Sequence, residues 1–155
     1  MTTHEPSISV SREIDAPAHE LFMCLARPAD HTSIDGTGML RGTDDRHALS
    51  GIGDVFEMKM FNDQLGEYVM ENHVVEFEPN RKIVWEPAGA GHPPLGHRWS
   101  WEFSPEGGST RVTHTCDWSG VTDERILAVL NFPRVSADQM AVSIDQLVAA
   151  ATNGG

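Results

Sequence analysis

Hydrophobic and polar residues alternate through most of the chain, and this period of two is typical of strands with one buried face. In residues 7–14 the apolar positions Ile8, Val10 and Ile14 share a face. Similar patterns occur within residues 51–62, 67–79, 81–86, 97–105 and 110–120, and a weaker one within 39–49. The segment 67–79 loses the period in its first half, which predicts a β-bulge there.

Two other regions space their apolar residues as amphipathic helices do. After the first strand, residues 15–27 have Asp15 as a predicted cap and Pro17 in the first turn, and Pro28 stops this helix. A second short helix is predicted from about 28 to 34. The last helix starts after its cap, Ser136. Its buried stripe consists of Met140, Ile144, Leu147, Val148 and Ala151.

The order of these elements predicts an α+β fold in a single domain. Short turns such as Pro79–Asn80 and Gly107–Gly108 join consecutive strands, so the sheet is expected to be antiparallel. One face of that sheet needs a cover, and the C-terminal helix is the long amphipathic element left to supply it. We therefore expect about six to seven strands curved around that helix, with a domain over residues 1–155 and a core from about 7 to 151.

Composition and charge disfavour several classes of partner and cofactor. The chain has 155 residues and a formal net charge of −12, which disfavours nucleic acids and anionic membrane surfaces as partners. It has no apolar run of about 18 residues and no secretory signal pattern, so we expect a cytoplasmic protein without membrane insertion. Cys24 and Cys116 are far apart and belong to no CxxC motif, and neither a metal nor a cofactor is predicted.

Three stretches resemble a known superfamily. IDAPAHELFMCLARPADH resembles its entry into the first helices, VVEFEPNRKIVWEP its central hairpin, and HRWSWEFSPEGGSTRVTHTCDW its last two strands. The chain is therefore similar to the bacterial single-domain members of the SRPBCC (START/Bet v 1-like, polyketide cyclase/dehydrase) proteins. The resemblance implies a helix-grip fold, with a cavity between the sheet and the last helix that holds a hydrophobic small molecule.

The residues of the expected inner face fit a cavity lining. Leu, Ile and Val usually fill a solid core, whereas this face is rich in Met, Trp and His, whose adaptable or amphipathic side chains suit a pocket. The alternative is an ordinary packed core with satisfied histidines. The residues predicted to contact a ligand are Phe56, Met58, Met60, Tyr68, His73, Phe77, Trp85, His97, Trp99, Trp101, His114, Trp118, Met140 and Ile144.

The stretch HTSIDGTG, residues 31–38, has a structural and a catalytic interpretation. In the first, Asp35 accepts backbone N–H groups in a turn and Gly36 ends the helix in a left-handed conformation. In the second, His31 and Asp35 form a general acid/base pair at the mouth of the cavity. A phosphate loop is disfavoured because no GxxxxGK[ST] pattern is present, and a metal site because no third ligand is apparent.

Three functions follow from this sequence. The leading hypothesis is a protein that binds or carries an aromatic, polyketide-like or lipid molecule. The alternatives are a polyketide cyclase, aromatase or dehydratase that uses His31 and Asp35 without a metal, and a regulatory partner protein with a vestigial pocket. Whether the protein is an enzyme is left open, as is a homodimer. The loop 87–96 and the segment 121–134 are candidate covers of the cavity.

Overall fold

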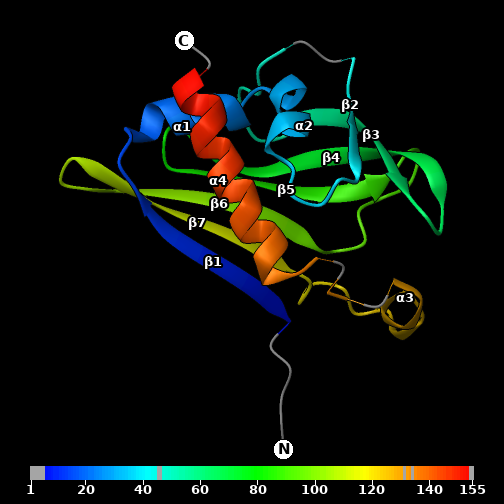
Figure 1. Ribbon diagram of the computed structural model, residues 1–155. Coiled ribbons are helices and arrows are strands. Elements are labelled where there is room, and N and C mark those ends of the chain that lie inside the picture. Colours follow the sequence, from blue (N-terminus) through cyan, green and yellow to red (C-terminus); the bar gives the residue numbers. More distant parts are fainter. Residues whose placement is uncertain (1–5, 45–46, 131, 134, 154–155) are drawn as a thin grey trace, which may run out of the picture.

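A curved, seven-stranded antiparallel sheet forms the body of the protein (Figure 1). The structure, a computed structural model, describes residues 6–44, 47–130, 132–133 and 135–153. The strand order is β1-β7-β6-β5-β4-β3-β2, so each strand from β2 to β7 pairs with its neighbour in sequence, and β1 closes the far edge against β7. The strands are β1 (Ser7–Ile14), β2 (Leu40–Gly42), β3 (Val55–Asn62), β4 (Gly66–Glu78), β5 (Lys82–Gly89), β6 (Arg98–Glu106) and β7 (Ser109–Asp117).

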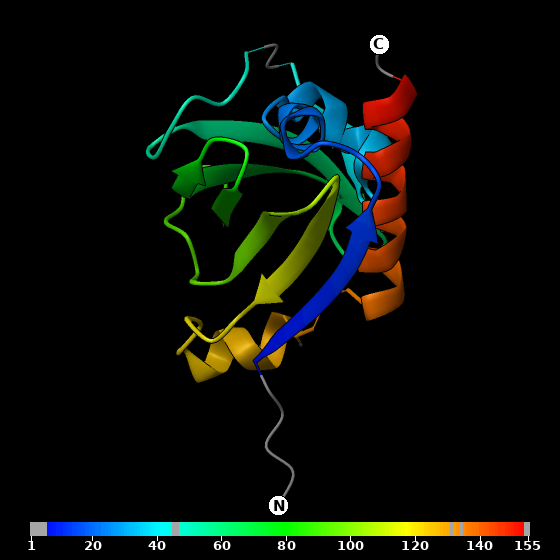
Figure 2. The ribbon, with the colours of Figure 1, turned by 90° about the vertical axis from the view of Figure 1, so that its left-hand side faces the viewer.

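The C-terminal helix and the helices that follow β1 lie on one side of this sheet (Figure 2). Between β1 and β2 come α1 (Ala18–Leu25), the 3-10 turn η1 (Pro28–Asp30) and α2 (His31–Ile34). The short helix α3 (Glu124–Leu130) precedes the long C-terminal helix α4 (Ala137–Asn153). Figure 2 shows α4 standing along the concave side of the sheet, with α1 and α2 near its C-terminal end. The predicted helix-grip arrangement is confirmed.

The turns and caps have local causes. Asn80 and Gly107 take φ values of 65° and 66°, the left-handed conformation that these two hairpin turns require. Ser136 caps α4 as predicted: its Oγ accepts the N–H of Gln139, and its own N–H donates to Oε1 of Gln139. The predicted cap of α1 is wrong. Pro17 occupies that position and makes no side-chain cap hydrogen bond.

A bulge in β4 changes which side chains face inward. The strand register shifts between Val74 and Glu76, later in the strand than predicted. Val74 is buried and pairs with Trp85, so alternation places Asn72 on the inner face and His73 on the outer one. The prediction that His73 shares the inner face with Phe77 is therefore wrong, because the extra residue lies between them.

The inner face has a closely packed region next to α1. Leu21, Phe103, Val112, Ile144 and Leu147 are all at most 2% exposed there. The edge of the Phe22 ring packs on Phe77 and on Phe103, with ring centroids 5.4 and 6.1 Å apart. Burial of large apolar side chains is the main source of stability in such a core.

Candidate functional site

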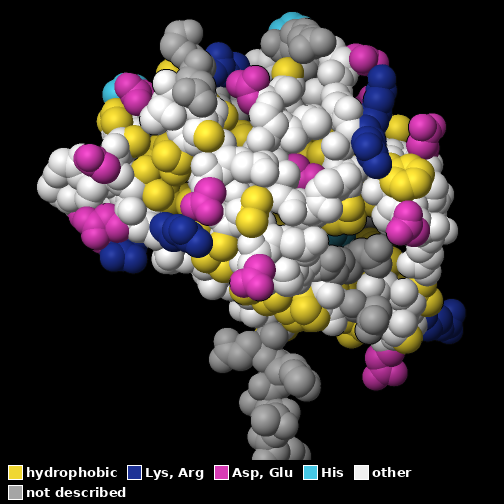
Figure 3. Space-filling model, viewed as in Figure 1, with side chains coloured by type: hydrophobic (Ala, Val, Ile, Leu, Met, Phe, Trp, Pro, Cys, Tyr) yellow, Lys and Arg dark blue, Asp and Glu magenta, His cyan; other side chains and the backbone are white. Residues whose placement is uncertain are grey.

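A cavity of about 520 Å³ lies on the inner face at the other end of α4. Its wall is formed by side chains of β3 to β7, by α2 and the loop that follows it, and by the N-terminal half of α4. Figure 3 shows the surface hollowed beside the lower half of α4. This volume is in the range of ligand pockets in proteins.

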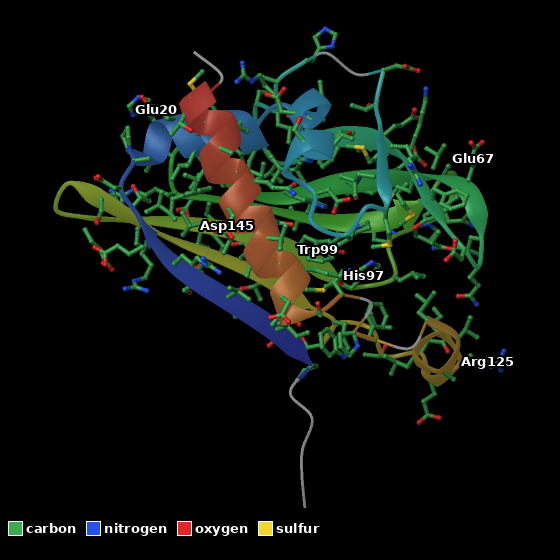
Figure 4. All side chains as sticks on the ribbon, viewed as in Figure 1. Glu20, Glu67, His97, Trp99, Arg125 and Asp145 are labelled. Atoms are coloured by element: carbon green, nitrogen blue, oxygen red, sulfur yellow. The ribbon has the colours of Figure 1, made fainter. Side chains whose placement is uncertain are left out.

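Most of the residues predicted to contact a ligand are at this wall. Trp99 and His97 lie beside the lower half of α4, on the side toward α3 (Figure 4). The predicted residues that line the cavity are Phe56, Met58, Met60, Tyr68, Trp85, His97, Trp99, Trp101, His114 and Met140, together with the proposed catalytic residues His31 and Asp35.

Four of the predicted contacts lie elsewhere. His73 is on the outer face, as the bulge explains. Phe77 and Ile144 belong to the packed region next to α1, because they lie nearer that end of their strand and helix. Trp118 follows the last residue of β7 and stacks on Phe132, which does line the cavity, at a centroid distance of 5.9 Å.

The sequence missed several lining residues. Met70 and Asn72 were assigned no face, because the misplaced bulge hid their alternation. Leu65, Leu95 and Leu130 come from a hairpin turn, a loop and α3, where side-chain direction follows no period. For Leu95 and Leu130 the sequence offered only the composition of the segments 87–96 and 121–134, which made these segments candidate covers of the cavity. Both segments do contribute to the cavity wall.

His114, on β7, stacks on two tryptophans of the neighbouring strand β6. Its ring stacks on Trp101 at 3.8 Å and on Trp99 at 5.3 Å between centroids, and the side chain is 5% exposed. Nδ1 lies 3.0 Å from the carbonyl oxygen of Ser100. Burial lowers the pKa of His114 to about 4, so the ring is neutral near pH 7. A carbonyl only accepts, so Nδ1 carries the proton and Nε2 is an acceptor.

His31 presents a second neutral imidazole to the cavity. Its Nε2 donates to the carbonyl oxygen of Leu25 at 2.7 Å, which leaves Nδ1 as the acceptor. The ring stacks on Trp85 and meets the Phe56 ring edge-on, with centroids 5.4 and 5.3 Å away. Burial lowers the pKa of His31 from its usual value.

Asp35 binds its own loop rather than His31. Its Oδ1 accepts the N–H and the hydroxyl of Thr37 at 2.9 and 2.6 Å, and its Oδ2 accepts the N–H of Leu40 at 3.1 Å. Within the described part of the chain, neither carboxylate oxygen of Asp35 bonds to the imidazole of His31. The geometry therefore agrees with the structural interpretation of HTSIDGTG, and the catalytic role of this pair stays a prediction.

Gly36 joins this loop to α4 by close approach. A Cβ at this position would lie 2.3 Å from the carbonyl oxygen of Gln139, and the N–H of Gly36 donates to Oγ of Ser143 at 2.9 Å. Gly36 is not among the glycines with positive φ, so the predicted left-handed helix end is wrong. The glycine is required because the backbone of α4 leaves no room for a side chain.

The chemistry of the remaining polar groups is limited. No three His, Cys, Asp or Glu side chains among the described residues are arranged to hold a metal ion. Cys116 lines the cavity, but burial raises the pKa of its thiol to about 12, so it is a poor nucleophile near neutral pH. None of the helices in the described ranges is both long and apolar enough to cross a membrane.

Comparison with known families agrees with this architecture. The family model described as activator of Hsp90 ATPase homolog 1-like protein matches residues 15–151. The chain belongs to this AHSA1-like family. The family is a member of the SRPBCC/Bet v 1-like superfamily, so the resemblance seen in the sequence is confirmed.

A curated relative matches this chain over part of its own length. The uncharacterized protein Rv0088 of Mycobacterium tuberculosis is 38% identical over 112 residues, which cover 72% of this chain and 47% of that protein. This chain thus spans about half the length of the curated relatives it matches.

Solved structures share the fold at low sequence identity. Protein Ms6760 of Mycobacterium smegmatis has a TM-score of 0.68 at 15% identity, covering 97% of this chain and 93% of that one. The Aha1 dimer of Colwellia psychrerythraea has a TM-score of 0.60 at 19% identity, covering 96% and 97%. DynU16, a putative protein in the dynemicin biosynthetic locus, has a TM-score of 0.61 at 14% identity, covering 97% and 49%.

Proposed function

We propose that this AHSA1-like protein binds an apolar small molecule in the cavity between its sheet and α4. The observation that carries the proposal is a cavity of about 520 Å³ whose wall is mostly Met, Trp, Phe and Leu side chains. A well-packed domain does not keep such a space, because empty volume forfeits dispersion contacts. Burying about 200 Å² of apolar ligand surface would contribute about 5 kcal/mol before the costs of association.

Access to the cavity is consistent with this role. Leu65, Val69 and Leu95 line the cavity and are also 59%, 36% and 37% exposed, so they connect its interior with the surface. They come from β4 and from the loops on either side of the β4–β5 pair. Such apolar side chains at a mouth allow an apolar ligand to enter without crossing a polar barrier.

Native mass spectrometry of freshly purified protein tests the proposal first. We expect an added mass, which extraction and identification would assign to an apolar compound. In parallel, the uncharged dye Nile red is expected to fluoresce when it binds. A mass equal to that of the bare chain, together with no binding of Nile red, would contradict the proposal.

A pair of variants links binding to the cavity. Met58 is 2% exposed and lines the cavity, whereas its neighbour Glu57 is exposed on the outer face of β3. Met58→Trp is expected to fill the space and lower the affinity for Nile red at least tenfold. Glu57→Trp adds the same ring outside and should leave the affinity unchanged. Equal affinities in the two variants would place the dye elsewhere.

Enzymatic function has weaker support. The cyclase hypothesis needs a proton-transfer group beside the ligand, and Asp35 already accepts three hydrogen bonds from its own loop. The family description refers to activators of Hsp90 ATPase, and a regulatory partner role remains the alternative to ligand binding. A stable complex with a partner protein that forms equally well with the unaltered chain and with the Met58→Trp variant would favour that alternative.

A further inference from the structure

The buried polar groups of the cavity wall suit one kind of ligand oxygen. His114 and His31 are both 5% exposed and neutral, and each has one ring nitrogen bonded to a backbone carbonyl. The second nitrogen of each ring has no hydrogen-bond partner among the described residues and is an acceptor. Both side chains line the cavity. The wall therefore offers two fixed acceptors that a ligand O–H group can satisfy.

The charges near the cavity disfavour an anion. Asp35 lines the cavity, and no Lys or Arg does so among the residues that the structure describes. Arg125 on α3 points away from the body of the protein (Figure 4), and Arg41 lies over the Phe61 ring at 5.0 Å. A carboxylate brought into this wall would lose its hydration and gain no opposite charge, which is costly in an apolar environment.

The environment of His114 also favours a flat ligand. Trp99 and Trp101 hold its ring in a stack, and Trp85 pairs with Trp99 across β5 and β6. All three indoles line the cavity, so a ring bound near His114 has aromatic faces and edges to contact. Aromatic pairs add to the free energy gained from area burial alone.

From these groups we infer that the cavity selects uncharged aromatic molecules that carry a hydroxyl group, which donates a hydrogen bond to Nε2 of His114, over carboxylates of the same size. This inference rests on the proposed function, because it specifies the ligand of the same cavity. His114 is the specificity-determining residue, and His31, the first residue of α2, supplies a second acceptor.

Three ligands with the same ring system test the selectivity by isothermal titration calorimetry at pH 7: 2-naphthol, naphthalene and 2-naphthoate. At this pH the phenol is neutral and the carboxylic acid is ionised. One net hydrogen bond predicts that 2-naphthol binds about three- to tenfold more tightly than naphthalene. The unpaired charge predicts that 2-naphthoate binds at least tenfold more weakly than 2-naphthol.

A matched pair of histidine variants assigns the hydrogen bond. His114→Phe keeps a ring beside the tryptophans and removes the acceptor, so the affinity for 2-naphthol should fall to that for naphthalene. His73→Phe makes the same change on the outer face and should keep the preference. A preference unchanged in His114→Phe would overturn the role of His114. Should that variant fail to fold, the three ligands on the unaltered protein still decide the selectivity.

The outcomes separate this inference from the proposed function. If 2-naphthoate binds as tightly as 2-naphthol, the selectivity is wrong while the cavity still binds apolar molecules. If 2-naphthol and naphthalene bind equally, the hydroxyl contact is wrong and the proposed function stands. If none of the three binds and Nile red also fails to bind, both proposals are wrong.

Discussion

The two ends of the inner face are built on the same strands and the same helix, yet one is packed and the other is hollow. At the α1 end, Phe103 and Val112 meet Ile144 and Leu147, and none of the four is more than 2% exposed. The next pair of inward-facing residues on β6 and β7, two positions away from Phe103 and Val112, is Trp101 and His114, and both line the cavity. The change from packed to hollow takes place within each strand rather than between separate elements.

The number of layers explains this difference. At the packed end α1 is a further helix over the sheet, and its residues Leu21, Phe22 and Leu25 fill the space beside α4. At the cavity, α1 contributes only one of its buried side chains, Leu25, and the rest of the cover comes mainly from the short helix α2, its loop and the N-terminal half of α4. Fewer side chains of the covering helices fill the space over the sheet there, so a cavity remains although its lining residues are large.

Truncation of a side chain at each end gives the largest expected contrast. Leu147→Ala removes a fully buried side chain from the packed end and is expected to lower the free energy of unfolding by about 2–5 kcal/mol. Met58→Ala at the cavity wall is expected to cost about 1–2 kcal/mol, because Met58 already borders empty space. Urea denaturation measures both. Equal losses would show that the cavity end is packed as tightly as the other.

Acid should destabilise the cavity end specifically. The pKa of His114 is about 4 in the folded protein and near 6.5 when the residue is exposed. Between these values the unfolded chain binds a proton that the folded chain does not, so the free energy of unfolding falls as the pH is lowered. The expected loss is about 2 kcal/mol between pH 7 and pH 5, and the contribution levels off below about pH 4.

The same two histidine variants locate this acid effect. His31 acts in the same direction, because burial lowers its pKa as well. His114→Phe should make the dependence of stability on pH shallower between pH 7 and pH 5, and His73→Phe should leave it unchanged. Urea denaturation at the two pH values provides the measurement. An equally steep dependence in His114→Phe would contradict the buried, neutral state of His114.

A side chain added where the loop after α2 touches α4 should also lower the stability. Gly36→Ala places a methyl group 2.3 Å from the Gln139 carbonyl oxygen, and the resulting shift is expected to cost about 1–3 kcal/mol. Gly108→Ala, where no atom lies within 4 Å of the added methyl group, should change stability by less than about 0.5 kcal/mol. Thermal unfolding of both variants checks this. Equal stabilities would show that the loop can move away from α4 without cost.

Much of this architecture was predictable because it depends on local periodicity. Alternation along β1, β3, β6 and β7 placed Met58, Trp99 and His114 on the inner face, and the stripe of α4 placed Met140 there. The errors occurred where a single residue shifts the period or where contacts come from distant elements. The bulge in β4 turned His73 outward, and Ile144 is assigned to the packed end by α1, which lies more than a hundred residues earlier in the chain.

The sequence by itself determined the order of strands and helices, the faces of most strands and the amphipathic, aromatic character of the inner face. These follow from side-chain direction, which repeats with a fixed period along each element. Only the tertiary structure decided that the space is hollow and that Gly36 touches α4. Both features depend on where separate elements end and on how closely those elements approach one another. A local pattern of residues encodes neither.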